Sequence, residues 1–126
     1  MLELISDLGG GKTTFVQGVA LGLGYQGEVV SPTFALSRIY PLPDGRQLHH
    51  FDLYRLNGTD VVIDELADCV GQPDIITAVE WPQMATEILP KDRLRINFEV
   101  ISDDERSITL TAHGARSSRV VEGLKS

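Results

Sequence analysis

The chain has 126 residues, 42% of them hydrophobic and 23% charged, which is an ordinary globular composition and predicts one domain over residues 1–126. Its formal net charge is −7, with 11 Lys and Arg against 18 Asp and Glu, which argues against independent nucleic-acid binding because phosphate contacts need clustered cations. A single cysteine excludes an internal disulfide, and no apolar run approaches the ~20 residues that span a bilayer.

The first residues predict a strand, a glycine loop and a helix in succession. Residues 1–5 are mostly apolar, like the end of a buried strand. Three consecutive glycines follow within residues 6–14, and they predict a tight loop because glycine costs backbone entropy inside a helix or a strand. Apolar residues then recur at three- and four-residue steps over residues 15–23, which is one face of a helix.

The middle of the chain predicts a hairpin, a helix and a buried strand. Residues 34–40 and 48–56 fit two strands joined by a turn that ends in Asp-Gly. A helix is expected from residue 59 or 60 to about residue 70. Residues 75–79 are apolar without alternation, which is typical of a strand buried on both faces of a parallel sheet.

The last third predicts a short helix and a second hairpin. The helix is expected to run through residues 84 and 88, and strict alternation over residues 94–100 and 108–112 indicates two antiparallel strands. The acidic turn between them, residues 102–106, is expected to be a solvated tip, and the tail from residue 114 to form one helical turn or fray. Strands alternating with helices, together with hairpins, predict an α/β sandwich on a mixed sheet.

The glycine loop matches the P-loop pattern Gly-x-x-x-x-Gly-Lys-Ser/Thr except at its first position, where Ser6 stands. Three glycines let backbone N–H groups point inward as an anion nest, and the helix N-terminus adds its partial positive charge. Lys12 would bridge the β- and γ-phosphates, Thr13 would bind Mg²⁺, and Thr14 could reach the α-phosphate. A glycine-rich turn without a ligand is the alternative.

A P-loop needs an acidic partner at the end of a neighbouring strand, and the chain has two candidates. Glu80 ends the buried run 75–79, and carboxylates at the carboxyl ends of parallel strands face the ligand crevice. Asp52 lies in the second strand of the first hairpin; its alternative is a salt bridge with Arg55.

Four sequence blocks together resemble the TsaE family, formerly YjeE, bacterial P-loop ATPases needed for threonylcarbamoyladenosine formation on tRNA. The blocks are residues 7–15, 31–34, 50–56 and 80–82, in the family's order and over nearly the whole chain. The resemblance implies a P-loop NTPase-like three-layer sandwich with a mixed parallel and antiparallel sheet. It also implies ATP and Mg²⁺ as cofactors. A cytoplasmic location is the default expectation, because the first residues show no basic segment followed by an apolar stretch.

The resemblance implies a role for each matching residue. Thr33 would sense the γ-phosphate in a switch-I-like loop, and Asp52 would position or activate the attacking water. Glu80 would be the Walker B acid and would hold the metal with Thr13. The expected catalytic residues are Lys12, Thr33, Asp52 and Glu80. The expected nucleotide-binding residues are Asp7, Leu8, Gly9, Gly10, Gly11, Lys12, Thr13, Thr14 and Trp81. For Trp81, core packing is an equal alternative.

The resemblance also implies two protein partners, TsaD and TsaB, with TsaD transferring the threonylcarbamoyl group to tRNA position 37. The tRNA would be bound mainly through these partners. Arg38, Arg55 or a partner could supply an arginine finger, and weak hydrolysis is expected of the isolated chain. There are two alternatives: a small P-loop kinase, and a nucleotide-dependent interaction module without efficient hydrolysis. A kinase usually needs an Arg-rich lid segment, and the sequence has none between its predicted helices.

Some positions depart from the family or carry no chemistry. Gln83 and Met84 follow Trp-Pro where the family usually has Glu-Arg, and five residues precede Ser6 where the family usually has a longer segment, so a truncated chain or a different adenine pocket is expected. His49 and His50 are expected to point to opposite faces of a strand as surface or hairpin residues. Cys69, which has no activating pattern, is expected to be a core residue.

Overall fold

A computed structural model describes residues 1–6, 11–29, 37–53 and 60–125, and only the backbone of residues 60–62, 83, 84 and 86. Its elements, in chain order, are β1 (Leu2–Ile5), α1 (Lys12–Gly22), β2 (Ser37–Pro41), β3 (Gln47–Asp52), α2 (Asp60–Cys69), β4 (Ile75–Glu80), η1 (Pro82–Ile88), β5 (Arg93–Val100), β6 (Arg106–His113) and α3 (Ala115–Lys125). Among these residues no helix is both long and apolar enough to cross a membrane.

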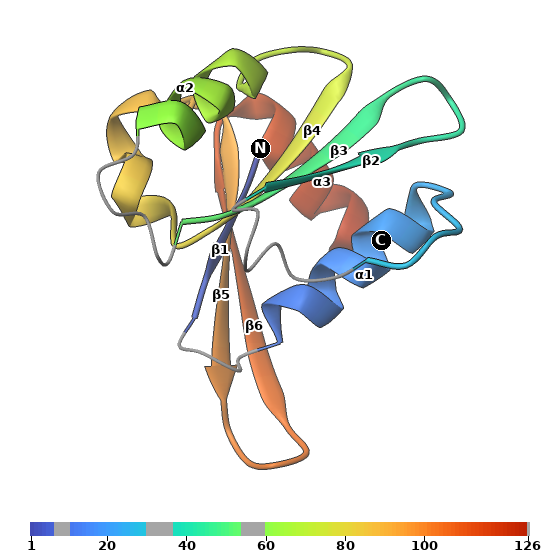
Figure 1. Cartoon of the computed structure of the whole chain (residues 1–126). Coiled ribbons are helices and arrows are strands. Elements are labelled where there is room, and N and C mark those ends of the chain that lie inside the picture. Colours follow the sequence, from blue (N-terminus) through green and yellow to red (C-terminus); the bar gives the residue numbers. More distant parts are fainter. Residues whose placement is uncertain (7–10, 30–36, 54–59, 126) are drawn as a thin grey trace.

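The strands form one six-stranded sheet in the order β2-β3-β4-β1-β5-β6. The four central strands are parallel, and the edge strands β2 and β6 pair antiparallel with β3 and β5. The predicted mixed sheet and both predicted hairpins are therefore confirmed. Because the central strands are parallel, the carboxyl ends of β3, β4 and β1 meet at one edge of the sheet, where α1 also begins (Figure 1).

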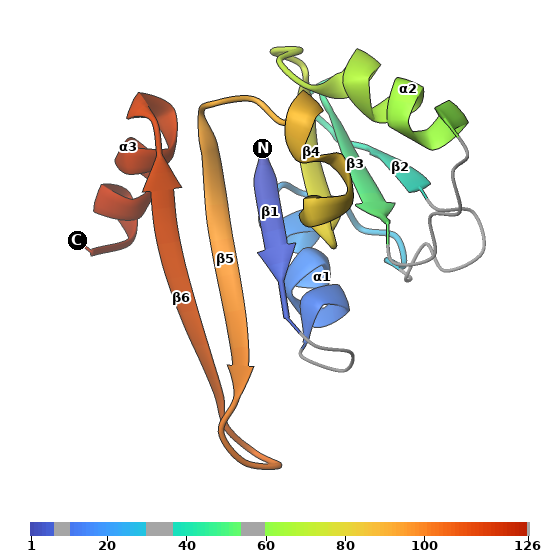
Figure 2. The ribbon, with the colours of Figure 1, turned by 90° about the vertical axis from the view of Figure 1, so that its left-hand side faces the viewer.

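Helices cover both faces of this sheet, which gives three layers (Figures 1 and 2). On one face α1 contributes Val16 and Ala20 to a core that includes Leu4 of β1. On the other face Leu66 of α2 packs in a cluster with Phe51 of β3 and other buried residues. The uninterrupted apolar run of β4 supplies both faces, as the sequence predicts for a parallel strand with helices on either side.

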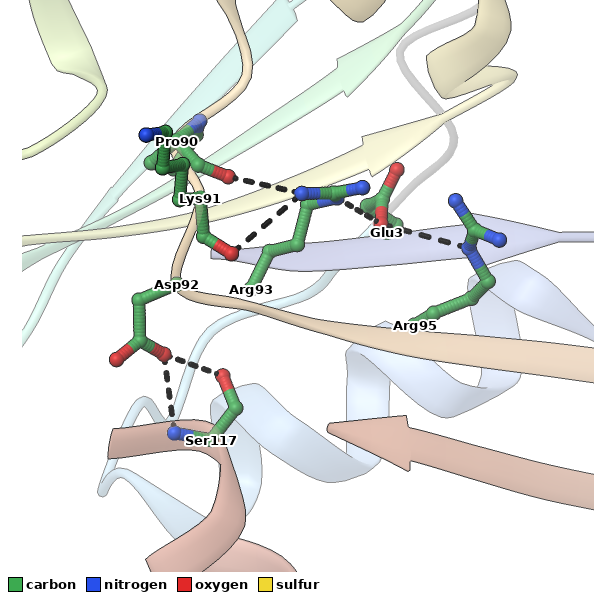
Figure 3. A network of polar contacts seen from close by, with 7 residues as sticks. All are labelled: Glu3, Pro90, Lys91, Asp92, Arg93, Arg95 and Ser117. Carbon is green, nitrogen blue, oxygen red and sulfur yellow. Dashed lines mark hydrogen bonds and ion pairs between the residues drawn. The ribbon is translucent and has the colours of Figure 1, made fainter. Parts of the chain in front are cut away.

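The chain's last described element is a full helix where the sequence predicts one turn or a frayed tail. α3 spans 11 residues, and its first turn is held by Asp92, which precedes β5. The carboxylate of Asp92 accepts hydrogen bonds from the backbone N–H and the hydroxyl of Ser117, at 3.0 and 2.8 Å (Figure 3). It also accepts one from the backbone N–H of Arg116 at 2.9 Å. These bonds satisfy helix donors that otherwise lack partners, so a distant residue fixes the start of α3.

Candidate functional site

The N-terminus of α1 carries Lys12, the lysine of the glycine-loop pattern. Gly11 precedes it with φ +99°, a left-handed conformation that favours glycine, and the Gly11 carbonyl accepts the first helical bond from the Phe15 N–H at 3.0 Å. Among the described residues no side chain caps this end, and the first turn has no acidic residue. The uncapped N–H groups and the helix dipole therefore make this end attractive to an anion.

Lys12 is unusually enclosed for a lysine, with 6% of its surface exposed. It lies one and two helical turns before Val16 and Ala20, so its stem continues the buried stripe of α1. Its Nζ donates to the Ser6 carbonyl at 3.3 Å and lies 3.9 Å from Glu80 Oε1. The cation is therefore held at the carboxyl edge of the sheet rather than in open solvent.

Glu80 ends β4 and is 4% exposed. Its register partners are Leu4 on β1 and Asp52 on β3, so it stands between the strand that leads to the glycine loop and the strand that carries the second carboxylate. The N–H of Leu53 donates to the Glu80 carbonyl at 3.1 Å, which continues the pairing one residue further. Glu80 and Asp52 thus share one face and one end of the sheet.

Trp81 follows Glu80 with φ +58°, the only positive φ of a non-glycine residue in the described part of the chain. Its ring lies 4.4 Å from Lys12 Nζ, a cation–π distance, and it also packs against the core cluster under α2. A left-handed tryptophan costs free energy, which the surrounding contacts must offset. The ring therefore contacts both the lysine and the core. Core packing is the alternative named from the sequence, and a contact with the nucleotide stays a prediction.

His49 and His50 lie on β3 of the predicted hairpin and point to opposite faces, as the sequence predicts, but the expectation of a surface position is wrong because both are buried. β3 lies inside the sheet between β2 and β4, and core clusters pack on both faces of it, with Leu48 on one side and Phe51 on the other. His50 is 0% exposed, and its Nε2 lies 2.6 Å from Glu80 Oε2. The available signal was its place two residues before Asp52, which puts both side chains on one face of a strand.

His49, on the opposite face, forms a separate pair with Cys69, the last residue of α2. Its Nδ1 lies 3.1 Å from the Cys69 Sγ, and its Nε2 lies 2.9 Å from Gln47 Oε1. Burial lowers the pKa of His49. Burial, and then the charges of Glu65 and Asp68, raise the pKa of Cys69. A thiol with a raised pKa is a poor nucleophile, so this pair is structural and Cys69 is the core residue that the sequence predicts.

The structure describes some of the other site residues predicted from the sequence. Thr13 is half-buried and Thr14 exposed on the first turn of α1, and Arg38 is exposed on β2. Outside the described residues lie Asp7, Leu8, Gly9, Gly10, Thr33 and Arg55. The structure therefore brings together Lys12, Asp52, Glu80 and Trp81, and adds His50 to them.

A three-layer α/β fold with a lysine-bearing, uncapped helix end beside two strand-end carboxylates defines a class of protein built to hold an anion at the carboxyl edge of its sheet. Within that class, the family profile described as threonylcarbamoyl adenosine biosynthesis protein TsaE matches residues 1–108. The chain belongs to this family.

Individual relatives agree with the family assignment. The tRNA threonylcarbamoyladenosine biosynthesis protein TsaE of Bacillus subtilis is 42% identical over 98% of this chain and 77% of its own length. The protein of the same name from Streptomyces coelicolor is 40% identical over 92% of this chain and 82% of its own length. The crystal structure of Bacillus subtilis YdiB matches with a TM-score of 0.73 and 38% identity, covering 98% of this chain and 75% of that one.

Proposed function

We propose that this chain binds ATP with Mg²⁺ and hydrolyses it in support of N6-threonylcarbamoyladenosine formation at tRNA position 37, in a complex with TsaD and TsaB. The observation that carries the proposal is the placement of Lys12 at the uncapped start of α1, 3.9 Å from Glu80 at the end of the adjacent parallel strand. A cation, the N-terminal N–H groups of a helix and a carboxylate at one point suit a phosphate chain with its metal.

The donors around Glu80 fit Mg²⁺ rather than a metal with an all-protein cage. In the described residues no group of three or more His, Cys, Asp or Glu side chains gathers as a metal site. Mg²⁺ is typically held by one or two carboxylates together with substrate phosphates. Glu80 and the Thr13 hydroxyl would hold the ion; when bound, it would neutralise charge on the phosphate oxygens.

The chain's own residues would divide the work of hydrolysis. The N–H groups at the start of α1 would bind phosphate oxygens, and Lys12 would exchange its contact with the Ser6 carbonyl for the β- and γ-phosphates. Asp52, beside Glu80 on β3, would orient the attacking water or accept its proton. Thr33 would sense the γ-phosphate, and Asp7, Leu8, Gly9 and Gly10 would complete the loop.

Hydrolysis by the chain alone is expected to be slow. Arg38, the described candidate for an arginine finger, is exposed on the edge strand β2. A partner protein could supply the missing cation, and an arginine finger contributes about 10³–10⁵ in rate. The net charge of −7 favours a role in which the partners bind most of the tRNA.

Two experiments test the proposal. The first titrates ATP and ADP, with and without Mg²⁺, and follows the fluorescence of Trp81, the chain's only tryptophan, whose ring contacts Lys12. No binding would refute the proposal, and binding without phosphate release, even with TsaD and TsaB, would favour the interaction module. Phosphate transfer to a metabolite would favour the kinase.

The second experiment compares variants in the reconstituted complex. Thr13→Ala and Glu80→Ala should abolish most Mg²⁺-dependent hydrolysis, because each removes an expected metal ligand. The matched controls are Thr111→Ala on the edge strand β6 and Glu122→Ala on α3, both exposed. Equal activity of the site variants and the controls would contradict the assignment of the site.

A further inference from the structure

His50 is a fully buried polar side chain inside the sheet, and its described hydrogen bond goes to the proposed metal ligand. Its Nε2 lies 2.6 Å from Glu80 Oε2, and its exposed fraction is 0%. On the same face of the sheet, Leu48 precedes it on β3 and Ala78 lies opposite it on β4, and both are apolar and buried. Its polar neighbours on that face are Asp52, two residues after it, and Arg38, opposite it on β2. An apolar residue at this position would pack without leaving a polar atom to satisfy, so the histidine calls for another reason.

The hydrogen-bond pattern of His50 fixes which ring nitrogen carries the proton. An ionised Glu80 oxygen can only accept, so Nε2 must donate. The other nitrogen, Nδ1, is buried and has no hydrogen-bond partner in the described part of the protein. Nε2 therefore makes the one hydrogen bond of this ring in the described part of the protein. His50 therefore acts on Glu80 as a fixed donor.

The hydrogen bond from His50 gives the two oxygens of the Glu80 carboxylate different neighbours. Oε2 is held by His50, and Oε1 lies 3.9 Å from Lys12 Nζ, on the side where α1 begins. Without the His50 bond, the plane of the Glu80 carboxylate would turn easily about the last side-chain torsion, because that torsion is soft. With the His50 bond in place, Oε2 faces the interior of the sheet and Oε1 faces Lys12 at the start of α1.

We propose that His50 is a positioning residue that holds Glu80 Oε2 and thereby presents Oε1 to the metal and phosphate site. The inference rests on the proposed function, since it gives Glu80 the role of metal ligand. Partners that orient a metal ligand typically change metal affinity or activity about 10- to 100-fold when they are removed.

The test uses two variants of nearly equal size. His50→Gln keeps an N–H donor within reach of Glu80, and His50→Met replaces it with an apolar chain. His49→Met is the matched control: His49 is the neighbouring buried histidine of β3, on the opposite face, bonded to Gln47 and Cys69. Circular dichroism and thermal unfolding establish that each variant is folded.

The main readout is the Mg²⁺ concentration that half-saturates binding of ATP, followed by Trp81 fluorescence. His50→Met should raise it about 10- to 100-fold and lower kcat, with KM for ATP and the affinity for ATP in EDTA little changed. His50→Gln should recover most of the loss, and His49→Met should match the wild type. Equal losses in the Gln and Met variants would mean that His50 only fills space, and an unchanged Mg²⁺ dependence in the Met variant would also overturn the proposal.

A second readout needs no nucleotide and separates this inference from the proposed function. In the unliganded chain, a slowly exchanging Nε2–H proton of His50 should appear in the NMR spectrum and disappear or shift in Glu80→Ala. Its absence from the wild type would overturn the inference, whatever the ATPase assay gives. If the wild type fails to bind ATP, the proposed function is refuted. The positioning role of His50 is then refuted too, even when this proton is present, because the inference takes Glu80 to be a metal ligand.

Discussion

Glu3 is a buried carboxylate in the middle of β1, the strand that leads to the glycine loop, and its replacement tests what holds that strand in register. It is 3% exposed; Arg93 Nε donates to its Oε1 at 2.6 Å, and Arg95 Nε lies 3.5 Å from the same oxygen (Figure 3). Glu3 and Arg95 are register partners on β1 and β5. The contact with Arg95 is an ion pair with poor hydrogen-bond geometry, so Arg93 supplies the bond.

The magnitude follows from the burial of the three side chains. Removing one partner of a fully buried pair costs about 3–5 kcal/mol, and exposed pairs contribute about 0–1 kcal/mol. Glu3 is buried, but Arg93 is 22% exposed and Arg95 remains nearby, so Arg93→Ala should lower the free energy of unfolding by about 2 kcal/mol. Replacing Glu3 and Arg93 together by leucine should recover most of this loss, because Arg95 is 37% exposed and can turn to water.

Urea unfolding followed by far-UV circular dichroism measures these free energies. The matched control is Glu122→Ala, which breaks the exposed pair with Lys125 at 3.5 Å and should change the free energy of unfolding by less than about 0.5 kcal/mol. The reasoning fails if Arg93→Ala costs no more than the control, or if the double leucine variant is less stable than Arg93→Ala.

Three further predictions concern the two cores and the last helix. Leu66 on α2 is 0% exposed, so Leu66→Ala should lower the free energy of unfolding, measured in urea, by about 2–5 kcal/mol. The Cys69 thiol should react with a thiol reagent only as fast as the protein opens, because burial raises its pKa; immediate reaction in native buffer would contradict this. The backbone N–H of Arg116 and the Ser117 hydroxyl hold the pKa of Asp92 below its ordinary value. Its stabilising contribution is therefore present above about pH 4, the unfolded value, and is lost as the pH falls through the folded value, so the difference in Tm between wild type and Asp92→Asn should shrink on acidification.

The sequence predicts well the elements whose evidence is local. The helical stripe of α1, the continuous apolar run of β4 and the alternation of β5 and β6 each depend on side-chain periods of 3.6 or 2 within one segment. The start of α3 could not be found in this way, because its cap is supplied by Asp92, 24 residues before Arg116. A helix that begins on a distant carboxylate has no local start signal.

The candidate site shows the same division between local and distant information. That Asp52 and Glu80 end strands, and that Lys12 begins a helix, can be read from each segment alone. Whether the carboxylates share a face depends on the register of β3 with β4, and a slip of one residue would turn a side chain to the other side of the sheet. For His50 the local signal is its place two residues before Asp52, but nothing near it in the sequence shows that β4 will bring Glu80 within 2.6 Å.

Register therefore links the stability of the sheet to the chemistry proposed for its edge. β1 pairs with β4 on one side, where Leu4 meets Glu80, and with β5 on the other, where Glu3 meets Arg95. Because Glu3 and Leu4 are adjacent on one strand, we expect the ion pair of Glu3 with β5 to contribute to the position of Leu4 beside Glu80. A β1 strand held less firmly should weaken phosphate binding at Lys12, so Arg93→Ala should raise the Kd for ATP measured by Trp81 fluorescence, while Glu122→Ala should not. An unchanged Kd in a destabilised Arg93→Ala variant would show that the core alone, through Leu4, is enough to hold the strand.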